Sequence, residues 1–152
     1  MTNFLKIAWS EVVQPLVQRP NHIQVAALCY RGKGKDRKVL MITSRVAKRW
    51  ILPKGWPIDG LDAKGTAAQE AWEEAGVRIA NINPEPLGAF EYRKRLNGGP
   101  KVPCAAQVFA IEVDHLEDEF PEVDERARQW VDPKEAAKMV KEPGLQAILN
   151  NF

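Results

Sequence analysis

The sequence contains few residues that could cross-link the chain or bind a transition metal. Its 152 residues include two cysteines, Cys29 and Cys104, far apart in the chain, and two isolated histidines, His22 and His115. A disulfide framework or a zinc site needs more cysteines or histidines at short, regular spacings. The pattern therefore argues against both and predicts two free, buried thiols in a reducing compartment.

Long apolar runs and a strong net charge are also missing. No stretch of about 18 apolar residues is present, as a membrane-spanning helix would require, and the first residues lack the features of a signal peptide. The formal net charge is only +2, which is too small to attract nucleic acid or a membrane surface through overall charge. We therefore expect a soluble, cytoplasmic protein with a small-molecule partner, and the sequence leaves its oligomeric state open.

What the sequence does have is a succession of strand and helix patterns that fits one domain over residues 1–152. Apolar segments at residues 23–30 and 39–45 flank a glycine-containing turn and predict a hairpin. Residues 4–17 fit a strand or a short helix. Further strands are expected at 49–53, 87–95, 101–113 and 129–131, and helices at 66–76, 133–140 and 144–149. This order predicts an α/β (α+β) fold with a mixed β-sheet sandwiched between helices.

The segment 66–76, TAAQEAWEEAG, is the strongest helix pattern in the chain. Asp62 or Thr66 could cap its first turn, and Gly76 stands where a left-handed residue commonly ends a helix. Residues 54–64 before it contain glycine, proline and charged residues and predict a loop. The helix is therefore expected to follow directly on a polar loop.

Three carboxylates of this helix share one face. At about 100° per residue, Glu70, Glu73 and Glu74 lie together, and the opposite face carries Ala68, Ala71, Trp72 and Ala75. Like charges on adjacent turns destabilise a helix by about a few tenths of a kcal/mol per pair, and no lysine or arginine inside the helix compensates them. A divalent cation such as Mg²⁺, which prefers carboxylate oxygens, would do so. The alternative is a solvated acidic face.

The spacing of these glutamates matches a known motif. Residues 55–77, GWPIDGLDAKGTAAQEAWEEAGV, resemble the Nudix box, in which a glycine, a glutamate and the run R-E-U-x-E-E-x-G-U occur at fixed intervals and U is a bulky aliphatic residue. The matching residues are Gly55, Glu70, Glu73, Glu74, Gly76 and Val77. Leu61 and Gln69 replace the glutamate and arginine that brace the loop in this family, and Ala71 replaces a larger aliphatic residue. Because both charged partners are missing together, we expect an altered brace without a stranded charge.

The resemblance implies a Nudix fold and a phosphoanhydride hydrolase. It assigns Glu70, Glu73 and Glu74 as catalytic, metal-binding residues, the carbonyl of Gly55 as a further ligand, and Mg²⁺ as the ion, with Mn²⁺ as an alternative. Water would attack a phosphorus atom of the substrate. The general base is either Glu70 or a glutamate of the later acidic segment, which offers Glu117, Glu119, Glu122 and Glu125.

A second segment narrows the resemblance. Residues 44–55, SRVAKRWILPKG, are similar to the branch of the family that hydrolyses diphosphoinositol polyphosphates and diadenosine polyphosphates. The resemblance implies that the phosphates are bound by basic residues, since arginine and lysine form charge-assisted hydrogen bonds with phosphate. The expected substrate-binding residues are Arg45, Arg49, Lys54 and Arg93, with Lys48, Lys94 and Arg95 as further candidates.

Several alternatives to these assignments stay open at this level. The basic residues could be ordinary surface charges. Trp50 and Trp56 are interpreted as packing residues rather than platforms for base stacking, and Trp72 and Trp130 as core residues. The activity could instead be that of a nucleotide-sugar or nucleoside triphosphate pyrophosphatase, or the domain could be a sensor that binds a nucleotide without cleaving it.

Overall fold

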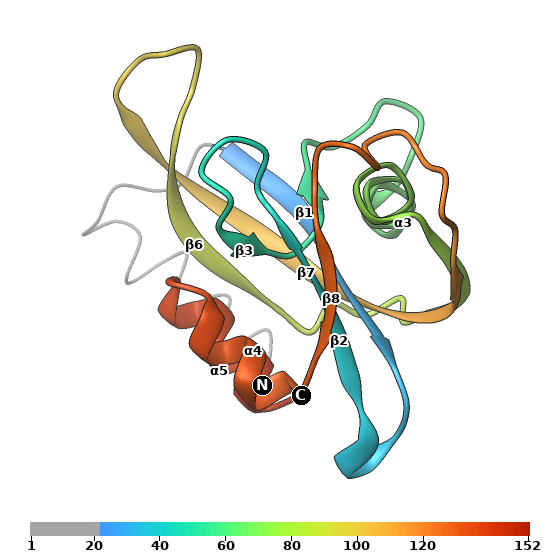
Figure 1. The fold of residues 1–152 in the computed structure, drawn as a ribbon. Coiled ribbons are helices and arrows are strands. Elements are labelled where there is room, and N and C mark those ends of the chain that lie inside the picture. Colours follow the sequence, from blue (N-terminus) through green and yellow to red (C-terminus); the bar gives the residue numbers. More distant parts are fainter. Residues whose placement is uncertain (1–21) are drawn as a thin grey trace.

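The computed structural model describes residues 22–152, so the choice between strand and helix for residues 4–17 lies outside the described part of the chain. Within that part the chain forms one eight-stranded sheet, three α-helices and one short 3-10 turn (Figure 1). The strands are β1 His22–Arg31, β2 Lys38–Thr43, β3 Trp50–Ile51, β4 Lys54–Gly55, β5 Val77–Ile82, β6 Gly88–Arg95, β7 Lys101–Leu116 and β8 Arg128–Val131. The helices are α3 Ala63–Ala75, α4 Pro133–Met139 and α5 Pro143–Asn150, and the turn is η2 Gly34–Asp36.

The sheet is mixed, as predicted. β1 runs parallel to β7 along nine paired residues, from His22 opposite Cys104 to Tyr30 opposite Glu112. The other pairings are antiparallel, including the predicted hairpin of β1 with β2 and the long hairpin of β6 with β7. The short strand β4 pairs with β1 and sets Gly55 opposite Val25. This pairing fixes the loop before α3 against the centre of the sheet.

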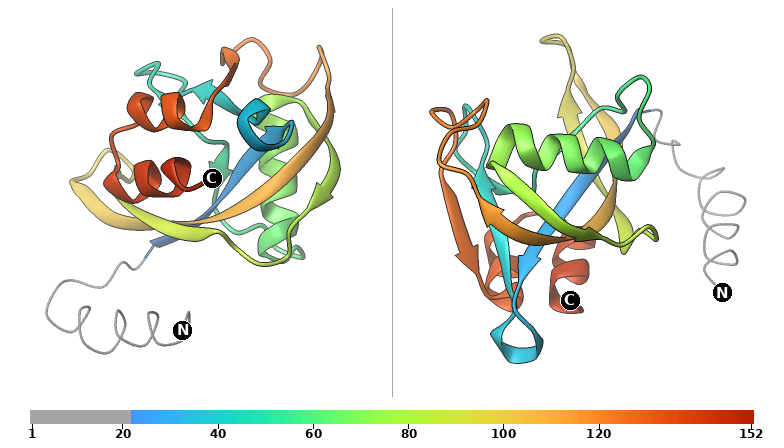
Figure 2. Two further views of the ribbon diagram at one scale, coloured as in Figure 1. Left: turned by 90° about the horizontal axis from the view of Figure 1, so that it is seen from below. Right: turned by 90° about the vertical axis from the view of Figure 1, so that its right-hand side faces the viewer.

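Two hydrophobic cores cover the two faces of the sheet. Successive side chains of a strand point to opposite faces, so Ala26 and Leu28 of β1 pack toward α4 and α5, whereas Ala27 and Cys29 pack toward α3. Figure 2 shows α3 on one side of the sheet and the C-terminal helices on the other. The predicted arrangement of a mixed sheet sandwiched between helices is confirmed.

Both ends of helix α3 are formed by residues that the sequence predicted as helix-terminating residues. Asp62 is its N-cap and accepts a hydrogen bond from the Gly65 N–H at 2.8 Å, which decides between the two predicted caps. Gly76 ends the helix in the left-handed conformation at φ 70°, where its N–H bonds the carbonyl of Trp72. Because side chains four residues apart share a face, Ala67, Ala71 and Ala75 are all fully buried against the sheet.

Two sequence-based interpretations are corrected by the fold. Trp72 is only half-buried, outside both cores, and the guanidinium of Arg78 lies 3.8 Å from its ring centroid. It therefore covers the flank of α3 and is not a core residue. Trp56, interpreted as a packing residue, is 40% exposed and lies outside both cores, whereas the half-buried Trp130 packs against the core beside α3 as predicted. None of the helices in the described part is long and apolar enough to cross a lipid bilayer.

Candidate active site

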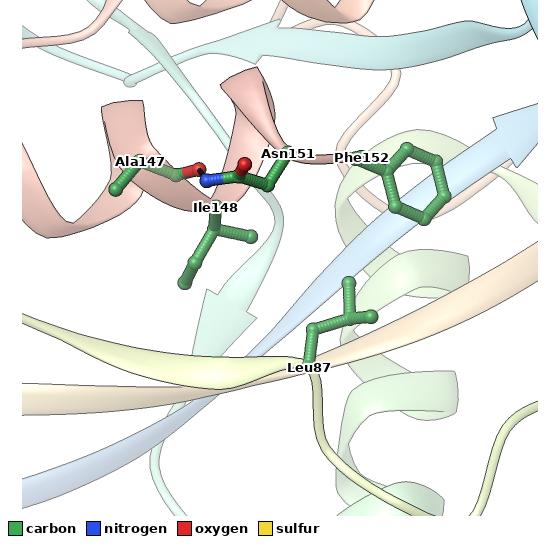
Figure 3. A pocket seen from close by; sticks show the side chains of 5 residues that line it. All are labelled: Leu87, Ala147, Ile148, Asn151 and Phe152. Carbon is green, nitrogen blue, oxygen red and sulfur yellow. Dashed lines mark hydrogen bonds between the residues drawn. The ribbon is translucent and has the colours of Figure 1, made fainter.

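The C-terminal helix borders a small pocket that is unsuited to phosphate chemistry. Its volume is about 240 Å³, and Figure 3 shows it between α5 and the residue before β6. It is lined by Leu87, Ala147, Ile148, Asn151 and Phe152. None of these side chains carries a charge, so the pocket offers neither metal ligands nor a partner for an anion.

A larger cavity, of about 630 Å³, lies between the loop before α3, the helix α3 itself and residues 117–127 between β7 and β8, which we call the acidic loop. We call it the acidic cavity, because three carboxylates reach it: Glu70 and Glu74 of α3 and Glu122 of the acidic loop. The basic residues on its wall are Arg45, Lys54, Lys94 and Arg126. Its volume is in the range that holds a nucleotide-sized ligand.

Gly55 and Glu70 are in close contact on the floor of this cavity. A Cβ atom at position 55 would come within 2.8 Å of Glu70 Oε2 and nearer still to the other carboxylate atoms. A glycine is therefore required here for steric reasons, since any side chain would occupy the space that the carboxylate fills. The pairing of β4 with β1 holds this backbone in place.

Glu70 and Glu74 lie side by side on consecutive turns of α3. Burial, a hydrogen bond with Glu74 and the negative charge of Glu74 raise the pKa of Glu70 to about 8. Burial also raises the pKa of Glu74, although the charge of Arg126 opposes that shift. Burial and the neighbouring negative charges disfavour ionisation of Glu70, whereas the charge of Arg126 favours the ionised form of Glu74.

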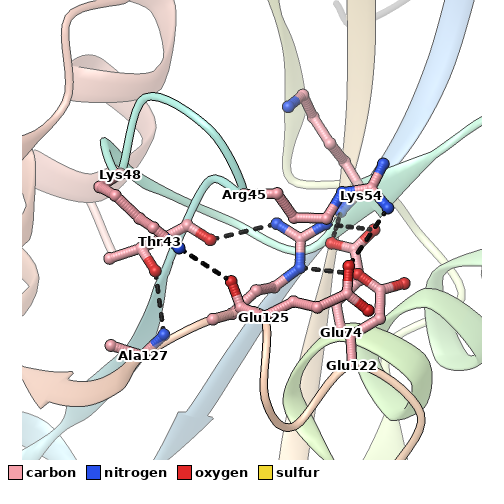
Figure 4. A network of polar contacts seen from close by, with 9 residues as sticks. Thr43, Arg45, Lys48, Lys54, Glu74, Glu122, Glu125 and Ala127 are labelled. Atoms are coloured by element: carbon pink, nitrogen blue, oxygen red, sulfur yellow. Dashed lines mark hydrogen bonds and ion pairs between the residues drawn. The ribbon is translucent and has the colours of Figure 1, made fainter.

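Arg126 is the positive charge closest to this acidic pair. Its side chain is 7% exposed, lies 3.7 Å from Glu74 and donates to Glu122 at 2.8 Å and to the Thr43 carbonyl at 3.1 Å. Figure 4 shows the surrounding network, in which Thr43 is bonded to Ala127 and Lys48 to the Glu125 carbonyl. Arg126 thus ties the acidic loop to the end of β2 and to α3.

Glu73 lies differently from its two neighbours. Its carboxylate accepts a hydrogen bond of 2.6 Å from the Gln69 amide, and it is not among the described residues that line the acidic cavity. Its negative charge nevertheless contributes to the raised pKa of Glu70. The structure therefore brings Glu70 and Glu74 together in the cavity and sets Glu73 beside them.

The loop before α3 is braced by a hydroxyl group. Thr66 is fully buried, and its Oγ1 accepts the Ile58 N–H at 3.2 Å. Leu61 stands at the family's glutamate position and is 45% exposed, while Gln69 bonds to Glu73. The missing glutamate–arginine brace therefore leaves no unpaired charge, and the Thr66 hydroxyl and the Asp62 cap hold the loop instead.

A second pocket adjoins the acidic cavity and carries most of the positive charge. It measures about 300 Å³ and shares Ser44, Ile51, Lys54 and Lys94 with the acidic cavity. We call it the basic pocket, because its charged lining consists of one carboxylate, Glu142, and of Arg49, Lys54, Arg93, Lys94, Arg95 and Lys101. The two hollows form one continuous site with an acidic and a basic half.

Lys54 connects the two halves. Its backbone N–H donates to Glu74 at 3.2 Å, and its ammonium lies 5.2 Å from the Tyr92 ring centroid in the basic pocket. Burial, followed by the charge of Lys94, lowers the pKa of Lys54 to about 8. An anion bound between these two lysines would compensate both charges.

The four predicted substrate-binding residues fall on this site. Arg45 lines the acidic cavity, Arg49 and Arg93 line the basic pocket, and Lys54 lines both. In the protein alone, Arg45 lies 3.5 Å from Glu125 and Arg49 lies 3.9 Å from Glu142. The first pair is exposed on both sides and therefore weak, and the second is long, so a phosphate could replace either carboxylate partner.

The sequence left some residues of the site undecided or unnoticed. Of the four acidic-loop glutamates, Glu122 lines the cavity, whereas Glu117 pairs with Arg78 and Glu125 with Arg45. Arg126 was not predicted. Its spacing of four residues from Glu122 was the available signal, but that spacing is read as a contact only inside a helix.

The donor set of the acidic cavity fits a hard divalent cation. Mg²⁺ commonly takes one or two protein carboxylates and completes its shell with waters and substrate phosphates. Glu70 and Glu74 provide such a pair. Across residues 22–152 no cluster of three or more acidic, histidine or cysteine side chains forms a ready-made metal site. The protein side chains would therefore share the ion with phosphate and water.

Comparison with known proteins agrees with this geometry. The family model of the NUDIX domain matches residues 20–152. Nudix hydrolase 13, mitochondrial, from Arabidopsis thaliana is 34% identical over 124 residues, which cover 76% of this chain and 59% of that protein. Diphosphoinositol polyphosphate phosphohydrolase 3-alpha from Homo sapiens is 31% identical over 121 residues, covering 78% of this chain and 68% of that protein.

Solved structures share the fold at lower sequence identity. An Ap4A hydrolase from C. elegans superimposes with a TM-score of 0.64 at 16% identity and covers 86% of this chain and 95% of its own. The chain spans 59% of the length of the first Arabidopsis relative, so the likeness concerns this domain. On the family match and the mixed sheet between helices, the chain belongs to the Nudix family and has the Nudix fold.

Proposed function

We propose that the chain is a divalent-metal-dependent hydrolase of phosphoanhydride bonds, with Mg²⁺ as the expected ion and Mn²⁺ as the alternative. One observation carries the proposal: the half-buried carboxylate of Glu70, the buried carboxylate of Glu74 and a cluster of basic side chains share one continuous site, joined at Lys54. Carboxylates alone would suit many cations, and lysines alone would suit many anions. Their combination suits a metal-bound polyphosphate.

In this proposal Glu70 and Glu74 hold the metal ion, and the Gly55 carbonyl is a further ligand. Glu73 remains a predicted ligand, although its carboxylate is engaged by Gln69. When bound, the ion would lower the pKa of the attacking water and screen the phosphate charges. The water oxygen attacks phosphorus, the bond from that phosphorus to the bridging oxygen breaks, and the water proton passes to a carboxylate. Glu70 and Glu122 both line the cavity and are the candidates for this base.

The basic pocket supports a substrate with several phosphates. Arg45, Arg49, Lys54 and Arg93 would bind them by charge-assisted hydrogen bonds. One relative carries the name diphosphoinositol polyphosphate phosphohydrolase, and one solved structure is an Ap4A hydrolase. These names support a diadenosine polyphosphate or a diphosphoinositol polyphosphate as the substrate type, before a nucleotide sugar or a nucleoside triphosphate.

A sensor that binds without cleaving is the second candidate, and it is favoured by the departures at Leu61 and Gln69. Against it stand the retained carboxylates and the Thr66 brace of the loop.

A cytoplasmic location remains a prediction, because the Arabidopsis relatives are named mitochondrial.

The test is an assay of phosphoanhydride cleavage over a panel of dinucleoside polyphosphates, inositol pyrophosphates, nucleotide sugars and nucleoside triphosphates. We expect turnover with Mg²⁺ and none with excess chelator. Glu74→Gln should lower turnover roughly 100-fold or more, since metal assistance contributes several kcal/mol to the transition state. The exposed strand residue Glu91 provides the control, and Glu91→Gln should match the parent.

The sensor hypothesis predicts that the parent binds a member of the substrate panel tightly without cleaving it.

Glu73→Gln is measured in the same cleavage assay and is also expected to lose most turnover. A Glu73→Gln variant at the parent rate would remove Glu73 from the ligand set. If Glu74→Gln also matches the parent, the metal assignment itself is wrong.

A further inference from the structure

The acidic cavity has an apolar rim that the chemistry proposed above does not use. Trp56 follows directly on Gly55 and is 40% exposed, and Val46, in the loop between β2 and β3, is 94% exposed. Both line the acidic cavity, together with Pro57 and Ile58. Exposed large apolar side chains beside a charged site commonly mark a ligand contact.

The Trp56 indole lines the acidic cavity and is partly exposed there. Its one aromatic contact among the described residues is with His22, at a centroid distance of 6.0 Å and an interplanar angle of 77°. An edge-to-face contact of this kind covers at most one face of the indole. The 40% of the residue that is exposed leaves part of the indole accessible to a planar ring.

The position of Trp56 along the chain links this face to the phosphate-binding residues. Lys54 reaches the basic pocket, Gly55 touches the carboxylate of Glu70, and Trp56 follows as the next residue. A ligand whose phosphates lie beside Lys54 and Glu70 would carry its next chemical group toward the indole. That group must be flat and at least partly apolar to gain from the contact.

Nucleoside polyphosphates and diphosphoinositol polyphosphates differ in whether they carry a flat, partly apolar group. A nucleoside polyphosphate carries a planar base with two π-faces, whereas a diphosphoinositol polyphosphate carries anionic groups around its ring and has no flat apolar face. We propose that Trp56, with Val46 lining the same cavity, is a base-binding subsite that selects a nucleoside polyphosphate. The inference rests on the proposed function, because it takes the phosphate site as given.

Equilibrium binding can isolate this contribution without turnover. Affinities for ATP and for inorganic tripolyphosphate, which has the same number of phosphates and no base, are measured by calorimetry with excess chelator. We expect the parent to prefer ATP by roughly tenfold, which corresponds to about 1.4 kcal/mol, because the base stacks on the indole. Trp56→Ala should abolish this preference by weakening ATP alone, and Trp56→Phe should retain most of it.

A second tryptophan provides the matched control. Trp72 is half-buried under Arg78 and does not line the acidic cavity, so Trp72→Phe should keep the parent's preference. Equal affinity of the parent for both ligands, or no ATP binding, would overturn the inference. So would a Trp56→Ala variant that weakens ATP and tripolyphosphate alike, because that result indicates a structural change.

Hydrolysis assays separate this inference from the function on which it rests. If the parent prefers ATP through Trp56 but cleaves no member of the substrate panel, the base subsite stands and the hydrolase proposal fails. If the parent cleaves diadenosine tetraphosphate and Trp56→Ala does so with an unchanged KM, the hydrolase stands and the base subsite fails. Preferred cleavage of an inositol pyrophosphate over diadenosine tetraphosphate would also contradict the subsite.

Discussion

Arg126 and Glu74 form a buried ion pair at the back of the acidic cavity, with 3.7 Å between Nη2 and Oε2 and side chains that are 7% and 8% exposed. Arg126 also bonds Glu122 and the carbonyl of Thr43. One guanidinium therefore holds together α3, the acidic loop and the end of β2. Removing one partner of such a pair leaves the other charge buried and unpaired, which lowers the free energy of unfolding. The pair can therefore be tested by measuring that free energy.

Replacing Arg126 by methionine should destabilise the fold strongly. The change removes the partner of the buried Glu74 and of the partly buried Glu122, and breaking a buried pair costs about 3–5 kcal/mol. Urea unfolding of the parent and the variant measures the loss. It should be smaller at about pH 5 than at about pH 8, because the stranded carboxyls can then take up protons.

The matched control is Arg45, whose side chain is 59% exposed and pairs with Glu125 at 3.5 Å. Arg45→Met should cost about 0–1 kcal/mol, as exposed pairs do. Equal losses for the two variants would show that burial of Arg126 has no energetic consequence.

Gly55→Ala should inactivate the protein more than it destabilises it. The new Cβ overlaps the carboxylate of Glu70, which must leave the cavity floor. Overpacking of this kind costs about 1–3 kcal/mol, whereas displacement of a proposed metal ligand should lower turnover roughly 100-fold. Turnover and urea unfolding are measured side by side.

Gly99, in the turn between β6 and β7, serves as the comparison. A Cβ there would approach only the Leu96 carbonyl, at 3.3 Å, and its backbone is not left-handed. Gly99→Ala should leave turnover unchanged. A Gly55→Ala variant as active as Gly99→Ala would mean that Glu70 can work from another position.

Thr66→Val tests the hydroxyl brace of the loop. Valine keeps the shape of the buried side chain but cannot accept the Ile58 N–H. We expect a loss of about 0.5–1.5 kcal/mol in unfolding free energy, the usual contribution of one hydrogen bond. Thr66→Ser keeps the acceptor and should retain the hydrogen bond, so a larger loss for serine than for valine would contradict the brace.

The sequence predicted the parts of the fold that depend on local pattern. The continuous apolar run of β1 and the helical spacing of apolar residues in α3 are local signals, and Gly76 and Asp62 are local end signals, so all were readable from short windows. The strand β5, Val77–Ile82, was not predicted. It alternates irregularly, and its pairing with β7 contains register shifts, so it depends on a partner more than 25 residues away.

The sequence predicted the part of the site that lies on helix α3. Helical spacing brings Glu70 and Glu74 together, and the structure agrees. The position of Glu73 depends on Gln69, which competes for its carboxylate, and helical geometry alone does not reveal that contact. Glu122 and Arg126 come from an irregular loop whose path is fixed by long-range contacts to Thr43 and Glu73. No local pattern could have selected them among the neighbouring charges.

Glu70 should make the metal-free protein less stable as the pH rises. Its carboxyl keeps its proton in the native state up to a pKa of about 8, whereas its ordinary value is 4.5. Between these values the native state binds more protons than the unfolded state, so the unfolding free energy falls as pH increases through this window. Urea unfolding with chelator, at several pH values from about 5 to about 8, measures the slope.

Glu70→Gln removes the titrating group and should flatten this part of the profile, because glutamine imposes no proton difference between the two states. Glu91→Gln, on the exposed strand β6, should leave the slope of the parent. Mg²⁺ should stabilise the parent more at the upper end of the window, where the carboxylate is ionised and can bind the ion, and less at the lower end. Parallel profiles for the parent and Glu70→Gln would show that the burial of this carboxyl does not govern the pH dependence.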